Sequence, residues 1–364
     1  MAACRALGRA GYAVDVTRSR RYEEAAVSRH AAVSFRVPPL PLAVSDWCDA
    51  VRRIVHAQTY DVVIATTDAV VAALPFLDLP VPTTPRMEGR QVALIDKGQL
   101  ADLCAQASVS YPRTDRPRTP AEDELVARGV GNPLVVKAAR SASVSSDQVI
   151  LLPGADVVRD PTSARRALGN IRRLGVDPIV QEYLEGQKLQ AAIIRRAGHT
   201  SCRLAFGVVR EFPPERGTET MLEALGTNTG TGERIVTMLE RLADAAGYDG
   251  LLQAEFIWVP HTRQLSVIDI NPRLWGSLTC AELLGYNMTE RVVRDAMGLD
   301  PMPQPPDPAG RRYHHVSREL RWLLAKRRFP RGYLSTFSVR DVWDLPSLTD
   351  PFPDLLRLKR AVTR

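Results

Sequence analysis

Two short apolar segments carry oxygen-bearing side chains at every second position. Gln253 and Glu255 alternate with apolar residues in the first segment, and Asp269, Asn271 and Arg273 alternate in the second. Alternate side chains of a strand lie on one face, so two adjacent strands would bring these groups together. Carboxylate and amide oxygens suit Mg²⁺, which takes few protein carboxylates and leaves positions for water and substrate phosphates. The spacing therefore predicts a magnesium site whose arginine faces the phosphates.

The alternative interpretation is a hairpin with a polar outer face. It explains the alternation, but it does not explain the Asn-Pro-Arg-Leu-Trp-Gly run that begins at Asn271. We therefore expect Glu255, Asp269 and Asn271 to bind a divalent cation, with Mg²⁺ preferred and Mn²⁺ as the alternative.

The length and composition indicate a globular protein of two or three domains, because 364 residues with 45% hydrophobic content can bury a large core. The longest apolar stretch, residues 62–81, contains Asp68, Asp78 and two prolines, so it is too broken for a membrane span. Arg5 and Arg9 interrupt the first helical pattern, which argues against a secretory signal. We expect a cytoplasmic protein that does not bind membranes.

The five cysteines are scattered, odd in number and without the paired spacing of a zinc site. They are expected to be reduced thiols.

The net charge of +7 is concentrated at the C-terminal end. Residues 310–364 hold 13 Lys and Arg against 5 Asp and Glu, while the preceding residues hold 35 against 36. Apolar residues recur at helical spacing over 320–324, which predicts an amphipathic helix docked on the body with its basic side outward. Nucleic-acid binding through this tail is the less favoured alternative and predicts a steep dependence of affinity on salt.

The fold class predicted is mixed α/β and α+β. Helical and extended patterns alternate over residues 1–85, which favours a parallel α/β layer. Such domains usually open with a strand and a glycine-rich turn, whereas this chain starts with a helical pattern. We therefore expect the N-terminal sheet to lack its first strand, with a gap or an exposed strand beside residues 12–16.

A second chemical pattern surrounds Lys137. This lysine ends an apolar strand at residues 132–137, and a loop of small polar residues, 138–146, separates it from another strand at 148–152. Small residues let backbone N–H groups approach phosphate oxygens. Hydroxyl donors could come from the loop serines, which are Ser141, Ser143, Ser145 and Ser146. The segment is thus expected to cover a phosphate.

Taken in order along the chain, these residues resemble the motifs of the ATP-grasp superfamily over roughly residues 87–300. The matching set is Lys97, Lys137, Gln181-Glu182-Tyr183-Leu184, Arg210, Glu255 and Asp269-x-Asn271-x-Arg273. The Trp-Gly-Ser that follows resembles the carboxylate–amine ligase-like subgroup, although Leu274 replaces its aromatic residue. The resemblance implies an N-terminal Rossmann-like (pre-ATP-grasp) domain at 1–86, an ATP-grasp domain at 87–300 with a lid at about 108–184, and a basic helical appendage at 301–364.

The resemblance also implies where ATP binds. Lys97 and Lys137 would contact its phosphates. Gln181 to Leu184 would receive adenine, with Glu182 accepting from the exocyclic amine and Tyr183 and Leu184 offering backbone groups. Ribose would contact Glu185 or Gln187, whose register against the family pattern is left open.

The catalytic residues implied are Lys137, Arg273 and Arg210. Glu255 and Asp269 would hold magnesium beside Asn271; Asp269 is shorter than the usual glutamate, so one ion and two both stay open. Arg273 would contact the γ-phosphate. Arg210 would steady the phosphoryl group or the acceptor carboxylate, and its alternative is a salt bridge with Glu211 or another neighbour. Trp275 would lie near a helix start beside the acceptor, and its alternative is a core position.

The implied function is an ADP-forming carbon–nitrogen ligase that activates a small-molecule carboxylate as an acyl phosphate and joins it to an amine, with amino acids among the candidates. One alternative is a carbamoyl-phosphate-synthase-like or carboxylase-like enzyme. Another is a catalytically degenerate nucleotide-binding protein. The substrates and the oligomeric state stay open, with a homodimer among the states allowed.

Overall fold

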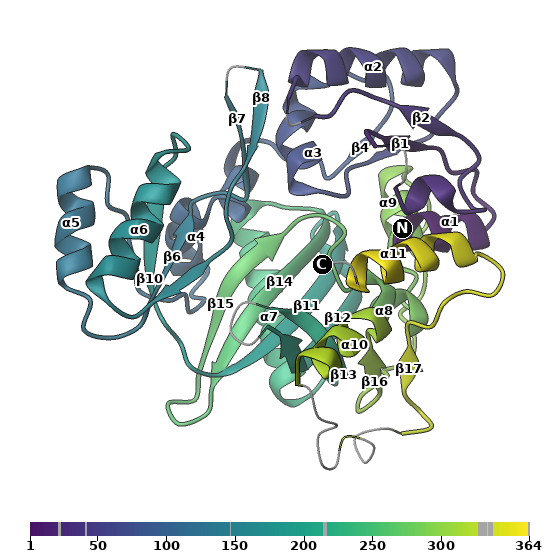
Figure 1. Cartoon of the computed structure of the whole chain (residues 1–364). Helices are drawn as coiled ribbons and strands as arrows, with labels where there is room; N and C mark the ends of the chain where they lie inside the picture. The colour runs from purple at the N-terminus through teal and green to yellow at the C-terminus, as the bar shows by residue number, and fades with distance from the viewer. Residues whose placement is uncertain are drawn as a thin grey trace.

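The computed structural model describes residues 1–20, 23–40, 42–145, 147–213, 217–326, 333 and 338–362, with side chains as far as residue 359. The described strands form one sheet of seven strands, one of four and three of two. Figure 1 shows the seven-stranded sheet at the centre, the four-stranded sheet with its helices on the left, and the N-terminal region at the top right.

The seven-stranded sheet has the order β15-β14-β11-β12-β13-β16-β17, and all its neighbouring pairs are antiparallel except β16 with β17. Its strands are β11 (Gln187–Arg196), β12 (His199–Phe212), β13 (Thr218–Ala224), β14 (Gly250–Val259), β15 (Gln264–Asn271), β16 (Arg312–His314) and β17 (Val342–Trp343). Period-two alternation of apolar residues gives this sheet two distinct faces. One face forms a core with α7 (Gly230–Ala246), which ends at Gly247 in the left-handed conformation that glycine tolerates.

The other face packs against α1 (Ala2–Arg9), α8 (Leu278–Leu283) and α9 (Met288–Ala296). This second face also carries the polar side chains of β14 and β15.

The four-stranded sheet is antiparallel and has the order β5-β10-β6-β9. Its strands are β5 (Thr114–Asp115), β6 (Leu134–Ala138), β9 (Asp156–Val158) and β10 (Pro178–Glu182). Helices α5 (Pro120–Arg128) and α6 (Pro161–Arg172) cover it through small and branched side chains. Thr119 and Asp160 cap these helices, and a proline follows each cap at a position where a missing N–H costs nothing.

The loop predicted at residues 138–146 is wrong in part, because residues 142–145 form a strand. β7 (Ala142–Ser145) and β8 (Gln148–Leu151) make a hairpin, and Ser146 at its turn lies outside the described residues. Ala142 and Val149 are buried in the core of the N-terminal region, against α2 (Val44–Ala57) and α3 (Asp68–Ala73). Apolar packing has therefore ordered a segment whose small residues predicted a loop.

The N-terminal region has the predicted parallel α/β character. Strand β1 (Val16–Arg18) pairs in parallel with β2 (Ser34–Arg36), and β3 (Val63–Ile64) pairs in parallel with β4 (Thr83–Thr84). Within the described residues these strands form two separate pairs rather than one continuous sheet. The remaining elements here are 3₁₀ turns η1 (Ala25–Val27), η2 (Leu74–Phe76) and η3 (Gly89–Leu94), and helix α4 (Lys97–Gln106).

The C-terminal segment differs from the predicted helical appendage. It contains α10 (Val316–Lys326) and α11 (Pro351–Val362), but β16 and β17 also join it to the large sheet. The predicted amphipathic orientation of α10 is wrong, because the helix buries Ser317 and Glu319 while Leu320 and Leu324 are 36% and 60% exposed. The helix therefore turns charged groups toward the protein.

All five cysteines, each within the described residues, are buried free thiols, as predicted. No helix in the described part of the chain is both long enough and apolar enough to cross a bilayer.

The buried His315, between β16 and α10, makes the folding stability of the protein dependent on pH. Burial, together with Arg318 and Arg357, lowers its pKa from 6.5 to about 2. Below pH 6.5 the His315 side chain is protonated in the unfolded chain but stays neutral in the folded chain. The free energy of unfolding therefore falls as the pH is lowered below 6.5, by roughly 1.4 kcal/mol per pH unit. We expect His315→Asn to reduce the fall of the melting temperature between pH 7 and 5.5, measured by differential scanning fluorimetry.

The matched control is His261→Asn, at an exposed turn position, which should keep the wild-type pH dependence. An unchanged slope in His315→Asn would show that other groups cause the loss.

Candidate active site

Glu255 and Asp269 lie opposite each other on β14 and β15. Directly paired residues of an antiparallel ladder point to the same face of the sheet. The neighbouring pair is Gln253 with Asn271, which shares that face. The three oxygen ligands predicted from the spacing are therefore adjacent in the structure.

Two lysines from other elements contact β15 beside these ligands. Lys97, at the start of α4, places Nζ 3.1 Å from Asp269 Oδ1 and donates to Ser141 Oγ at 3.2 Å. Lys137 comes from β6 of the four-stranded sheet and donates to the backbone oxygen of Ile268 at 3.0 Å. Both lysines that were assigned to phosphate contacts thus lie at the edge of β15.

The electrostatics of this cluster are strongly coupled. Burial lowers the pKa of Lys137 to about 8, against the opposing effect of Asp269. Burial raises the pKa of Glu255 to about 7, and Asp269 and then Glu219 add to that rise. Burial also acts to raise the pKa of Asp269, but Lys97 and Lys137 outweigh it and the pKa lies below its ordinary value.

The donor set fits a hard cation. Asn271 Nδ2 donates to Gln253 Oε1 at 2.8 Å, which leaves the amide oxygen Oδ1 for a cation. Two carboxylates and one amide match the few protein ligands that Mg²⁺ requires. In the described part of the chain, no group of three or more His, Cys, Asp or Glu side chains is arranged to hold a metal, so the proposed site relies on the amide of Asn271 as its third protein ligand.

Arg273 is held by a residue that the sequence did not point to. Its Nε and Nη2 atoms lie 2.5 and 2.6 Å from the two carboxylate oxygens of Asp68, at the start of α3. This bidentate pair fixes the plane of the guanidinium and links the N-terminal region to the end of β15. A residue 205 positions away along the chain carries no sequence signal for such a contact.

The predicted adenine segment lies between the two larger sheets. Gln181 and Glu182 end β10, while Tyr183 and Leu184 precede β11, where Gln187 begins the strand. The buried Gln181 donates from Nε2 to Thr114 Oγ1 at 2.8 Å. Glu182 Oε1 accepts from the backbone N–H of Arg113 at 3.0 Å.

Gly186 in the same connection has a steric requirement. A Cβ atom there would lie 2.2 Å from the backbone oxygen of Trp258, so only glycine fits.

Arg210 forms a salt bridge, as the alternative interpretation allowed, but its partner is on the C-terminal segment. Its Nη1 contacts Glu319 of α10 at 2.5 Å, and its guanidinium lies 4.3 Å from the Trp322 ring centre and 5.2 Å from that of Tyr333. Glu211, the neighbour considered from sequence, is paired with Lys188 instead.

Trp275 is buried in the core with residues of α8, which agrees with the alternative prediction that it occupies a core position. Ser277 directly precedes that helix and donates to Gln190 Oε1 at 3.1 Å. Sequence reasoning did not single out Gln190 and Glu319, because their partners, Ser277 and Arg210, lie 87 and 109 positions away along the chain.

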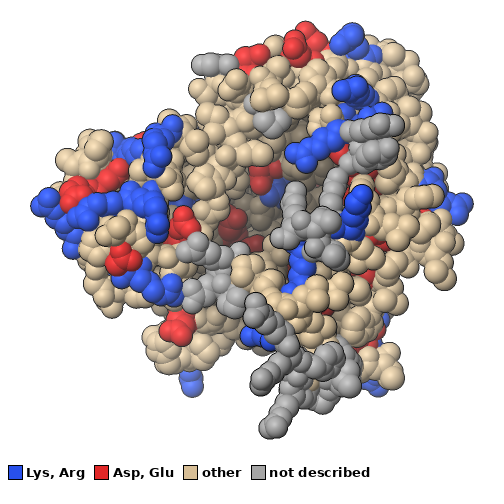
Figure 2. All heavy atoms as spheres, in the orientation of Figure 1, with Lys and Arg blue, Asp and Glu red and all other residues tan. Residues whose placement is uncertain are grey.

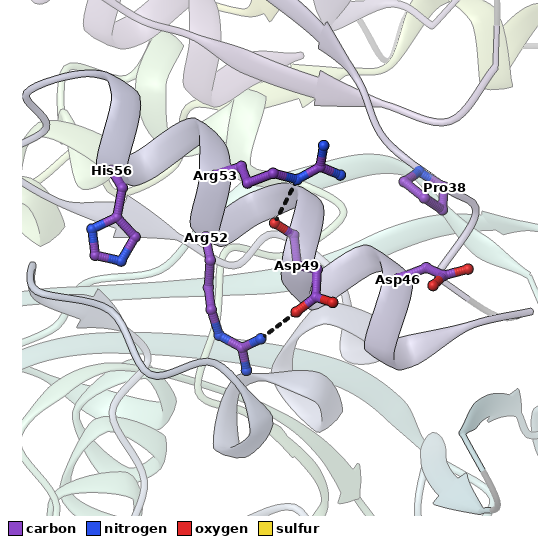
Figure 3. Close-up of a pocket in the computed structure, with 6 residues that line it drawn as sticks. All are labelled: Pro38, Asp46, Asp49, Arg52, Arg53 and His56. Atoms are coloured by element: carbon purple, nitrogen blue, oxygen red, sulfur yellow. Dashed lines mark hydrogen bonds and ion pairs between the residues drawn. The ribbon is translucent and has the colours of Figure 1, made fainter.

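Figure 2 shows acidic and basic atoms inside a recess on the face seen in Figure 1, over the seven-stranded sheet. A separate open depression of about 520 Å³ lies along α2. Its lining residues are Pro38, Asp46, Asp49, Arg52, Arg53 and His56 (Figure 3). Arg52 is already paired with Asp49 at 2.7 Å, and none of the predicted site residues lines this depression, so we assign it no role.

Several solved structures share the fold of this chain. The L-amino acid ligase from Bacillus licheniformis matches with a TM-score of 0.62 and 17% identity, over 83% of this chain and 71% of that chain. The biotin carboxylase domain of 2-oxoglutarate carboxylase from Hydrogenobacter thermophilus, in complex with MgADP and bicarbonate, matches with a TM-score of 0.61 and 14% identity, over 83% and 68%.

Carboxyaminoimidazole ribonucleotide synthase from Aspergillus clavatus, complexed with ATP, matches with a TM-score of 0.62 and 16% identity, over 83% and 74%. No protein-family model matches the sequence, and no curated protein sequence matches it. At this level of identity the likeness establishes architecture. The chain has the ATP-grasp fold.

Proposed function

We propose that this protein is an ADP-forming ligase that activates a small-molecule carboxylate as an acyl phosphate and then joins it to an amine. The observation that carries the proposal is the Glu255–Asp269 pair with Lys97 and Lys137 at its edge. Two acidic and two basic groups brought together in this way can hold a cation and a polyphosphate. The described residues supply these groups from three elements besides β14, which are β15, α4 and β6.

ATP is the proposed nucleotide and Mg²⁺ the proposed cation. Glu255, Asp269 and Asn271 would hold Mg²⁺, which supplies neutralisation of the charge that builds on the phosphates. Lys97 and Lys137 would bind phosphate oxygens as mobile point charges. Tyr183 and Leu184 would offer backbone groups to adenine, with Glu182 at its amine and Gln187 at the ribose.

The chain is proposed to act as three domains, at 1–86, 87–300 and 301–364, with a lid at about 108–184. The four-stranded sheet, whose strands span residues 114–182, falls inside that lid range. Closure of the lid would exclude water from the acyl phosphate, which water would otherwise hydrolyse.

In the proposed reaction a substrate carboxylate oxygen attacks the γ-phosphorus of ATP, and the bond to the β-phosphate oxygen breaks to give ADP. Arg273 would contact the transferred phosphoryl group, with its guanidinium oriented by Asp68. The amine then attacks the acyl carbon, phosphate leaves, and an amide bond remains. Phosphoryl transfer needs positioning and electrostatic stabilisation more than a covalent catalyst.

The test is ADP release with a panel of amino acids and small carboxylic acids, each with and without an added amine. We expect at least one carboxylate to stimulate release, and hydroxylamine to trap the acyl phosphate as a hydroxamate. Release that depends on neither a carboxylate nor bicarbonate would contradict the proposal.

A carboxylase-like or carbamoyl-phosphate-forming enzyme is the second candidate, because the same fold holds bicarbonate in the carboxylase domain cited above. Stimulation by bicarbonate, without hydroxamate formation from an organic acid, would favour it. A protein that binds ATP with no release under any condition would be the degenerate nucleotide-binding protein.

A further inference from the structure

Helix α10 lies against the same seven-stranded sheet whose strands β14 and β15 carry the candidate metal ligands. It packs on β13 and β12, on the viewer's side of the large sheet in Figure 1. Its buried residues are polar, Ser317 and Glu319, while Leu320 and Leu324 are exposed. Because apolar burial drives most helix docking, a helix with this orientation must be held largely by what its polar groups contact.

Arg318 of α10 contacts Glu219 on β13 and lies beside Gly276, which follows strand β15. Its Nη1 donates to the backbone oxygen of Glu219 at 3.0 Å and to Glu219 Oε1 at 3.3 Å. Its Nη2 lies 3.8 Å from the position that a Cβ atom would take on Gly276. The side chain of Arg318 is 23% exposed.

Glu219 connects this arginine to the strand of Arg210. It lies on β13 and pairs with Glu211 of β12, the residue next to Arg210. Gly276 follows Arg273 by three positions, so Arg318 faces the segment directly after the proposed phosphoryl contact.

The neighbouring residue on α10 has a different partner. Glu319 holds Arg210 through its Oε2 atom, which also accepts from the Tyr333 hydroxyl at 2.8 Å. The C-terminal segment thus contributes to this side of the sheet at two consecutive positions.

We propose that Arg318 binds the carboxylate of the substrate, so that α10 forms the acceptor side of the active site. This inference rests on the proposed function and names the residue that selects its substrate. An arginine fork matches a carboxylate with two parallel hydrogen bonds, and Nη2 of Arg318 has no acceptor among the described residues. A substrate whose carboxylate is esterified or amidated would lose this contact.

The test compares Arg318→Met with wild type in the ADP-release assay, using the carboxylate that stimulates best. We expect the KM for that carboxylate to rise about tenfold or more, while the KM for ATP stays within about twofold. Arg318→Lys should recover part of the loss, because a lysine keeps the charge without the fork. The matched control is Lys326→Met, which removes one positive charge from the exposed end of the same helix and should change neither KM.

A purely structural role for Arg318 would give a different result. Glu219→Gln breaks the ion pair but leaves the guanidinium in place, so the carboxylate KM should stay equal or fall. Equal losses in Glu219→Gln and Arg318→Met, or a rise of both KM values in Arg318→Met, would overturn the inference while leaving the proposed function intact. A wild-type protein that no carboxylate stimulates would overturn both.

Discussion

Replacing Glu255 by glutamine should abolish carboxylate-dependent ADP release, with a loss of at least roughly 100-fold in rate. Glutamine keeps the shape of the side chain but removes one of the two charges that face each other across β14 and β15. The remaining carboxylate and amide would hold a divalent cation poorly. The measurement is ADP release over a magnesium titration, together with the melting temperature.

The melting temperature separates a lost ligand from a damaged fold. Glu255 is a carboxylate whose pKa is raised by burial and by its Asp269 neighbour, so its neutral replacement should not destabilise the sheet. The matched control is Glu240→Gln on α7, against the opposite face, where the carboxylate pairs with Arg203 at 2.9 Å. Wild-type ADP release in Glu255→Gln would contradict the proposal that Glu255 binds the metal ion.

Lys137→Met should weaken ATP binding by about 10- to 100-fold and lower the turnover rate. The lysine is 7% exposed and is directed at the backbone of β15, where the opposing charge of Asp269 acts on it. Methionine fills the same volume without the charge. Calorimetric titration with ATP and Mg²⁺ measures the affinity without requiring any acceptor substrate.

Two controls accompany this measurement. Lys326→Met removes an exposed lysine and should bind ATP as the wild type does. The backbone oxygen of Ile268 loses its Lys137 donor in the variant, which should cost roughly 1 kcal/mol of folding stability and lower the melting temperature slightly. Wild-type ATP affinity in Lys137→Met would show that this lysine is structural.

The Asp68–Arg273 pair makes the proposed site depend on the N-terminal region, because Asp68 of that region orients the arginine.

The effects of the variants at Lys137 and Glu255 should be non-additive, because both residues have Asp269 as a neighbour.

Local periodicity allowed the central part of the site to be predicted. Glu255, Asp269 and Asn271 share a face because side chains of a strand alternate, and this geometry holds wherever the strand lies. The start of helix α5 is also fixed locally, because the Thr119 side chain accepts from the backbone N–H of Glu122 within the same turn. The loop predicted at residues 138–146 was wrong in part, because Ala142 packs in the core of the N-terminal region and the local sequence does not indicate that contact.

The sequence by itself determined the fold class, because the motifs that resemble ATP-grasp proteins occur in order from Lys97 to Arg273. It also placed Glu255, Asp269 and Asn271 on one face, because that geometry depends only on a spacing of two positions within a strand. Only the tertiary structure decided that Arg273 pairs with Asp68, 205 positions away, and that Arg210 pairs with Glu319, 109 positions away. It also decided that α10 turns its polar side inward. A long-range ion pair depends on how two distant elements pack together, and the local sequence pattern of either element contains no information about that packing.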